Sequence, residues 1–250
     1  MEDFKEKIKG VKLVSVCHVS NIDGMINPIK DIIKIAHKNG AKVLVDAAQS
    51  VPHMPVDVKK LDADFLAFSS TKMLGPSGMG VLYGKKKELL KLEPMFLGGS
   101  TVHNSSYDNY SLEDLPMRFE GGVQNYAGII GFGAAVEYLE KIGMKKVYAH
   151  EKDLGKYLAD GLRNLGCEIL NGSEDYSRGV ISFNIKGMSA HSIAGMLNES
   201  GIMIRSGMHC VHSWFNAKDI NGSARISLYI YNTKEECDKV MDVIKNIINL

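Results

Sequence analysis

The alternation of apolar strands with an amphipathic helix near the start of the chain is the feature that most constrains its fold. Val11–His18 and Lys42–Asp46 have the continuous apolar composition of buried strands, and a helix is predicted between them over Pro28–Asn39. Two more short strands are predicted over 64–69 and 79–83. This order is typical of an α/β fold with a mostly parallel sheet, whose ligands bind beyond the carboxyl ends of its strands.

The second part of the chain has a different organisation. The segment 92–125 is irregular and rich in glycine, and helices are expected after it over about 127–142 and 147–165. Short strands and helices then alternate as in a compact α+β unit: strands 179–184, 202–205 and 225–230, and helices 190–199 and 233–248. We therefore expect two domains, 1–145 and 146–250, the second made of a linking helix and a small α+β domain.

Composition excludes several classes of function. Among 250 residues, 30 are Lys or Arg and 29 are Asp or Glu, so the charge favours neither nucleic acid nor a membrane surface. The sequence contains no apolar run of bilayer length and no apolar core of a signal peptide near its start. The four cysteines lack the spacing of metal-ligand pairs and suit reduced thiols in a cytoplasm: Cys17, Cys167, Cys210 and Cys237.

A lysine and an aspartate follow two of the predicted strands. Lys72 lies among small hydroxyl residues before the turn Gly75-Pro76, and Asp46 ends its strand. A lysine amine in this setting can form a Schiff base with an aldehyde cofactor, while a carboxylate holds the cofactor's ring nitrogen protonated. Each residue alone has a simpler interpretation, since most lysines are solvated and a carboxylate after a strand often caps a turn. The pair favours pyridoxal phosphate (PLP).

Other polar side chains lie close to these two in the sequence. Gln49 follows Asp46 and can donate to the cofactor's ring hydroxyl, and the hydroxyl of Ser69 can donate to a phosphate. Cys210 follows Arg205 and His209 in a polar loop, where positive charge would raise the thiolate fraction. A free cysteine is nevertheless more often a small buried hydrophobe, and we assign that structural role to the other three cysteines.

Two further residues are candidates for binding a substrate carboxylate. Arg225 is expected to begin a strand, and its planar guanidinium suits bidentate binding of a carboxylate, although a surface ion pair is an equally good interpretation. Asn21 ends the first predicted strand and could assist the same carboxylate or contact the cofactor ring. His18 beside it has the alternative role of a hydrogen-bonded core histidine.

Taken together, these segments resemble the class V aminotransferase family of fold-type I PLP enzymes, and within it the SufS-type (group II) cysteine desulfurases and selenocysteine lyases. The matching segments occur in family order along nearly the whole chain: His18-Val-Ser-Asn21, Val45-Asp-Ala-Ala-Gln49, Pro55-Val-Asp57, Ser69-Ser-Thr-Lys72 with Gly75-Pro-Ser-Gly78, Arg118-Phe-Glu-Gly-Gly122, Arg205-Ser-Gly-Met-His-Cys210 and Ala224-Arg225-Ile-Ser-Leu228. Each segment is a weak signal, and the ordered set is a strong one.

The resemblance implies a role for each candidate. Lys72 would attach the cofactor and move the substrate's α-proton, and Cys210 would attack the sulfur of substrate cysteine, leaving alanine and an enzyme persulfide. The remaining cofactor contacts would come from Asp46, Gln49, Ser69 and Thr71, and the substrate carboxylate contacts from Asn21, Arg205 and Arg225. The resemblance also implies a homodimer, a sulfur-acceptor protein and a part in iron–sulfur cluster assembly.

The chain departs from the family pattern in several places. Thr71 stands where a histidine is usual, Val123-Gln124 where Thr-Pro is usual, and Met208 replaces the first of two histidines before the cysteine. The long N-terminal part of the family, which supplies further strands and a phosphate-binding turn, has no counterpart here. We therefore expect a C-terminal fragment, a split subunit or a degenerate paralogue. The alternatives are a selenocysteine lyase, an aminotransferase or a catalytically silent protein.

Overall fold

The computed structural model describes residues 1–170 and 179–249, and these divide into two compact units. Unit 1 comprises 1–17, 28–48 and 57–141, and unit 2 comprises 18–27, 49–56 and the described residues of 142–250. The predicted boundary at 145 assigned both short segments of unit 2 to the first domain. Hydrogen bonds within unit 2 explain the difference, because Ser182 Oγ donates to Ile22 O at 2.5 Å and Tyr229 OH donates to Pro52 O at 3.0 Å.

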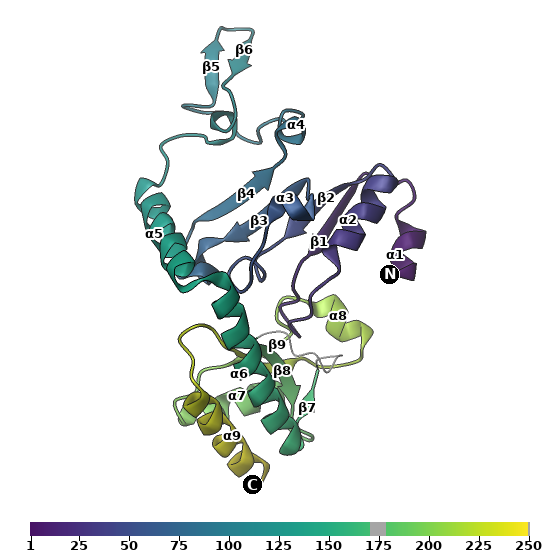
Figure 1. The fold of residues 1–250 in the computed structure, drawn as a ribbon, viewed down its shortest axis with the longest axis vertical. Coiled ribbons are helices and arrows are strands. Elements are labelled where there is room, and N and C mark those ends of the chain that lie inside the picture. Colours follow the sequence, from purple (N-terminus) through teal and green to yellow (C-terminus); the bar gives the residue numbers. More distant parts are fainter. Residues whose placement is uncertain (171–178, 250) are drawn as a thin grey trace. The chain divides into compact units, whose positions relative to one another are not determined.

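The sheet of unit 1 is mostly parallel (Figure 1). Its order is β1-β2-β3-β4, with β1 (Leu13–Cys17), β2 (Lys42–Asp46) and β3 (Phe65–Ser69) parallel and β4 (Gly80–Gly84) antiparallel to β3. The carboxyl ends of β1, β2 and β3 therefore lie at one edge of the sheet. The predicted α/β fold with a mostly parallel sheet is confirmed.

Helix α2 (Ile29–Lys38) forms where the sequence predicts it. Its buried residues Ile29, Ile32, Ile33 and Ala36 repeat every three to four positions and form one apolar stripe. Pro28 precedes its first turn, and the helix ends before Gly40, which has a φ of 79° that glycine adopts without strain.

Unit 1 contains several shorter elements that the sequence did not predict. They are α1 (Glu2–Lys7), α3 (Val58–Leu61), the 3₁₀ helix η1 (Ser70–Met73), α4 (Lys86–Leu89) and the 3₁₀ helix η2 (Met117–Phe119). The segment 92–125, predicted to be irregular, includes the hairpin of β5 (Val102–Ser105) and β6 (Tyr110–Leu112). This hairpin extends away from the four-stranded sheet, and α5 (Tyr126–Ile142) follows it (Figure 1).

A buried carboxylate holds together the edge of unit 1's sheet opposite the strand ends. The Asp64 side chain is 1% exposed and accepts hydrogen bonds from His37 Nε2 at 2.7 Å and Val43 N at 2.9 Å. Lys42 and Lys85 lie 3.7 Å and 3.6 Å from it. Burial alone would raise the pKa of Asp64, but the hydrogen bonds from His37 and Val43 outweigh burial, and the pKa is lowered.

Replacing Asp64 by asparagine is expected to lower the free energy of unfolding by about 2 to 4 kcal/mol, because His37 and the two lysines lose a buried counter-charge. Urea unfolding followed by circular dichroism measures this loss. The matched control is Asp62→Asn, since the Asp62 side chain is 65% exposed while contacting the same His37 and Lys85. It should cost less than about 1 kcal/mol. Equal losses for the two variants would contradict this account.

Unit 2 is built on a second, antiparallel sheet of order β7-β8-β10-β9. Its strands are β7 (Glu168–Ile169), β8 (Val180–Asn184), β9 (Arg205–Gly207) and β10 (Ser223–Ser227). Its helices are α6 (Met144–Asn164), α7 (Ala190–Glu199), α8 (His212–Ala217) and α9 (Lys234–Ile248). The strand predicted over 202–205 is wrong, because pairing with β10 begins only at Arg205 and continues to Gly207. Arg225 lies inside β10 rather than at its start.

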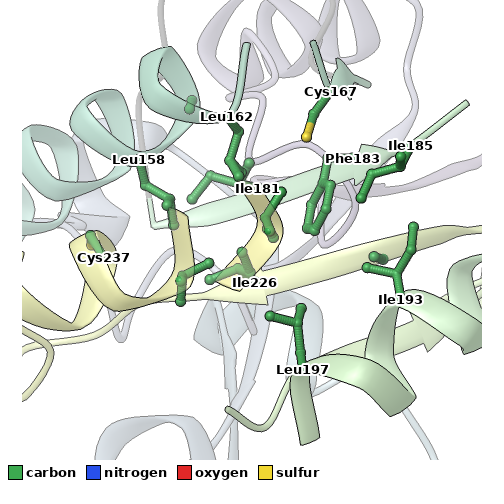
Figure 2. Close-up of a cluster of buried hydrophobic side chains, with 14 of the residues drawn as sticks. Leu158, Leu162, Cys167, Ile181, Phe183, Ile185, Ile193, Leu197, Ile226 and Cys237 are labelled. Atoms are coloured by element: carbon green, nitrogen blue, oxygen red, sulfur yellow. The ribbon is translucent and has the colours of Figure 1, made fainter. Parts of the chain in front are cut away.

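The core of unit 2 is a single apolar cluster between this sheet and its helices. Leu158 and Leu162 of α6, Ile181 and Phe183 of β8, and Leu197 of α7 are fully buried and converge there (Figure 2). Cys167 and Cys237 belong to the same cluster, and burial raises the pKa of each thiol to about 11. Both are inert structural cysteines, in agreement with their predicted role. Within residues 1–170 and 179–249, no helix is long and apolar enough to cross a bilayer.

Candidate functional site

The strand ends of unit 1 present four of the predicted cofactor-binding residues. Asp46 ends β2 opposite Ala67 of β3, and Ser69 ends β3 two residues farther along. Thr71 and Lys72 follow in η1 and are exposed. The exposed Asp46 carboxylate accepts a hydrogen bond from the N–H of Ala48 at 2.9 Å. This is the contact expected of a carboxylate that caps the turn after a strand. A carboxylate, two hydroxyls and an amine thus lie along one sheet edge.

A buried serine that the sequence did not single out shapes the lysine loop. The hydroxyl of Ser70 donates to the carbonyls of Pro76 and, at 3.2 Å, Met79, while its N–H donates to Met79 O at 3.0 Å. Its own carbonyl accepts the N–H of Gly75 at 3.0 Å. These bonds close the turn after η1 and leave Lys72 on its exposed side. The sequence did hold a sign of this buried serine. Two adjacent serines, Ser69 and Ser70, stand at a strand end, where successive side chains point to opposite faces.

Unit 2 brings together four of the predicted residues at its loop after β9. Asn21 Nδ2 donates to the carbonyl of His209 at 2.8 Å, and Arg225 Nη1 donates to the carbonyl of Asn21 at 2.9 Å. Arg205 Nη2 donates to Cys210 Sγ at 3.6 Å, and both side chains are exposed. The guanidinium of Arg205 therefore lies in contact with an accessible cysteine sulfur.

The predicted contribution of His209 to the charge near Cys210 is wrong. The imidazole is 3% exposed, and its Nε2 lies 2.9 Å from Ser223 Oγ and 3.1 Å from Ser223 O. Burial lowers the pKa of His209 to about 4, with further lowering by repulsion from Arg225 and Arg205. At neutral pH the ring is uncharged, so the positively charged group next to the Cys210 thiol is Arg205.

Gln49 and Cys17 lie in settings that the sequence did not anticipate. Gln49 belongs to unit 2, in its segment 49–56. Two contacts attach this segment to the rest of unit 2: Tyr229 OH donates to Pro52 O, and His53 lies 3.0 Å from Glu151. Of the residues predicted to bind the cofactor, Gln49 belongs to unit 2, and Asp46, Ser69, Thr71 and Lys72 belong to unit 1. Cys17 was predicted to be buried in a strand and is exposed at the end of β1.

Comparisons with known proteins find a family and relatives for nearly the whole chain. The family profile described as "Aminotransferase class-V" matches residues 1–240. The chain is 44% identical over 246 residues to the cysteine desulfurase of Haloferax volcanii and 44% identical over 239 residues to a probable cysteine desulfurase of Halalkalibacterium halodurans. The structure of the apo cysteine desulfurase from Thermococcus onnurineus NA1 superposes with a TM-score of 0.96 at 41% identity.

These matches cover nearly all of this chain but only part of each relative. They include 98% and 95% of the chain and 58% and 59% of the Haloferax and Halalkalibacterium proteins. For the Thermococcus structure the shares are 99% of this chain and 62% of that one. The chain therefore spans about 60% of the length of these relatives. Because the family profile extends over almost the whole sequence, the chain belongs to the class-V aminotransferase family.

Proposed function

We propose that the protein carries the catalytic residues of a PLP-dependent cysteine desulfurase, which converts cysteine to alanine and keeps the sulfur as a persulfide. The observation that carries this proposal is the exposed Cys210 with Arg205 Nη2 at 3.6 Å from its sulfur. The naming of similar proteins as cysteine desulfurases supports it. An aminotransferase has no use for a thiol beside a guanidinium, and so fits these residues less well.

The donors at the strand ends of unit 1 suit PLP. An exposed amine at Lys72, an exposed carboxylate at Asp46, and the hydroxyls of Ser69 and Thr71 match an aldehyde, a ring nitrogen and a phosphate. Ser69 Oγ and Thr71 Oγ1 lie 3.4 Å apart, so both can reach one phosphate group. Bound PLP supplies an electron sink that weakens bonds near the α-carbon of an amino acid. Gln49 completes the proposed cofactor-binding set.

The proposed tasks of this chain's residues follow from their chemistry. Arg225 and Asn21 would bind the substrate carboxylate, with Arg205 assisting, because guanidinium and amide groups donate to carboxylate oxygens. The Lys72 amine would take the substrate's α-proton and return a proton to carbon. The Cys210 thiolate would form an S–S bond to the substrate's sulfur while the C–S bond breaks and its electron pair remains with carbon, which a proton then converts to alanine.

Three finer assignments accompany this proposal. We assign the protein to the SufS-type desulfurases, with an acceptor protein that takes the persulfide sulfur for iron–sulfur cluster assembly. The four scattered cysteines, which lack the spacing of a disulfide framework, suit a cytoplasmic location. A homodimer through unit 1 is supported by its exposed large apolar side chains, among them Phe96, Tyr126 and Ile130. Sedimentation that gives a monomer mass at micromolar concentration would contradict the dimer.

The test of the function is the product formed from cysteine. We expect purified protein supplied with PLP, cysteine and a reducing thiol to release alanine and sulfide in equal amounts. A transaminase would instead give an oxo acid and need an amino acceptor. Selenocysteine in place of cysteine identifies the lyase alternative, which would yield alanine from selenocysteine only. Oxo acid without alanine, or no turnover by folded protein that binds PLP, would refute the proposal.

A further inference from the structure

The loop that carries Cys210 has an unfavourable backbone. His209 and Cys210 have φ values of 47° and 66°, so two successive residues with side chains adopt the left-handed region. Gly207 before them has a φ of 106°. Such a conformation persists only where surrounding contacts impose it. The contacts that hold this loop therefore decide where the Cys210 sulfur lies.

His209 supplies most of these contacts. Its ring is buried, bonds to Ser223 of β10 through Nε2, and packs against Phe215 of α8 with ring centroids 6.0 Å apart. Its carbonyl accepts the amide of Asn21 at 2.8 Å. The residue is thus fixed through both its side chain and its backbone. His209 is buried whereas its neighbour Cys210 is exposed, with Sγ within reach of Arg205.

The hydrogen bonds of His209 also define its protonation. A carbonyl oxygen only accepts, so Nε2 must carry the hydrogen that is shared between Ser223 O and Oγ. Among the described residues, Nδ1 has no hydrogen-bond partner. The charged groups that face the ring are Arg225 of β10 and Arg205 of β9, both positive. A second proton on the ring is therefore disfavoured, and the single hydrogen of His209 at neutral pH is the one on Nε2 that Ser223 holds.

We propose that His209 is a positioning residue, which fixes the Cys210 loop to β10 through Ser223 and thereby holds the Cys210 sulfur beside the Arg205 guanidinium. The inference rests on the proposed function only in assigning sulfur acceptance to Cys210. It differs from the usual role of a histidine next to a reactive cysteine, which is to act as its base or counter-ion.

The test measures the rate at which iodoacetamide alkylates Cys210 as a function of pH, read by mass spectrometry of the peptide that contains it. Neither cofactor nor substrate is needed. His209→Phe keeps a ring but loses the bond to Ser223, so the thiol should leave Arg205. We expect alkylation at neutral pH to slow about tenfold. His209→Gln, whose amide nitrogen can replace Nε2, should restore the wild-type profile to within about threefold.

A double-mutant cycle between His209 and Arg205 distinguishes a positioning role of His209 from a general loss of structure. Arg205→Gln should slow alkylation to the same extent, and the double variant His209→Phe/Arg205→Gln should be no slower than either single variant. Ser223→Ala, which retains the carbonyl, should lie between wild type and His209→Phe. If His209→Phe does not fold, the His209→Gln and Ser223→Ala profiles still decide the matter.

Three results would overturn the proposal. They are an unchanged profile in folded His209→Phe, full additivity with Arg205→Gln, and a wild-type profile with a second inflection near the ordinary pKa of histidine. Failure of the proposed function would be distinct, because alanine would not form from cysteine while the alkylation results would still hold.

Discussion

Replacing Cys210 by serine is expected to abolish sulfur transfer from cysteine, with a loss on the order of a thousandfold or more. The hydroxyl of serine is a much weaker nucleophile toward sulfur than a thiolate, and Arg205 cannot ionise it. PLP binding should be unchanged, because the cofactor-binding residues proposed on unit 1 do not include Cys210. The measurement is alanine production together with the absorbance of bound PLP.

Cys17→Ser is the matched control for this experiment, since Cys17 is the other exposed cysteine of the chain and has no proposed part in the reaction. Its turnover should equal that of the wild type. Undiminished alanine production by Cys210→Ser would remove Cys210 from the reaction. Equal losses in both variants would point to a general requirement for thiols rather than to the Arg205–Cys210 pair.

The second large effect is expected from Lys72→Ala. In the proposed function, loss of this amine would remove both the covalent attachment of PLP and the base that moves the substrate's α-proton. Turnover should fall on the order of a thousandfold or more. Lys72→Arg should fail as well, because a guanidinium keeps the positive charge but does not react with an aldehyde at neutral pH.

Lys60→Ala is the control for the loss of one lysine charge, since the Lys60 side chain is 79% exposed on α3 of the same unit. It should retain both PLP absorbance and turnover. Borohydride reduction of the wild type, followed by peptide mapping, should place the pyridoxyl group on Lys72. Its attachment to another lysine, or turnover by Lys72→Ala, would contradict the role of this residue.

The fold could be predicted where hydrophobic periodicity and end signals agree. The boundaries of β2 and α7 match their predicted ranges, and α2 differs by one residue at each end. The prediction of strands failed where strand pairing depends on residues distant in the sequence. Ile202, Met203 and Ile204 have the composition of a strand, but the pairing with β10 starts at Arg205. The short polar strands β5 and β6 carry too few apolar residues to form an alternating pattern.

The candidate residues were identifiable from the sequence because each follows a predicted strand or stands in a motif. What the sequence did not contain was the direction of each side chain. His209 turns inward to Ser223, and Ser70 turns inward to Pro76 and Met79. Likewise, Gln49 lies three residues after Asp46 yet belongs to the other unit. These features depend on contacts with residues distant in the sequence.

The most direct test of the central claim is the mass of the peptide that contains Cys210, measured after the protein has reacted with cysteine and PLP without reductant. We expect a mass increase of one sulfur atom on this peptide in the wild type and none in Lys72→Ala. Both proposed catalytic residues are thereby tested in a single product. Sulfur on a different cysteine, or on Cys210 in the absence of Lys72, would contradict the account.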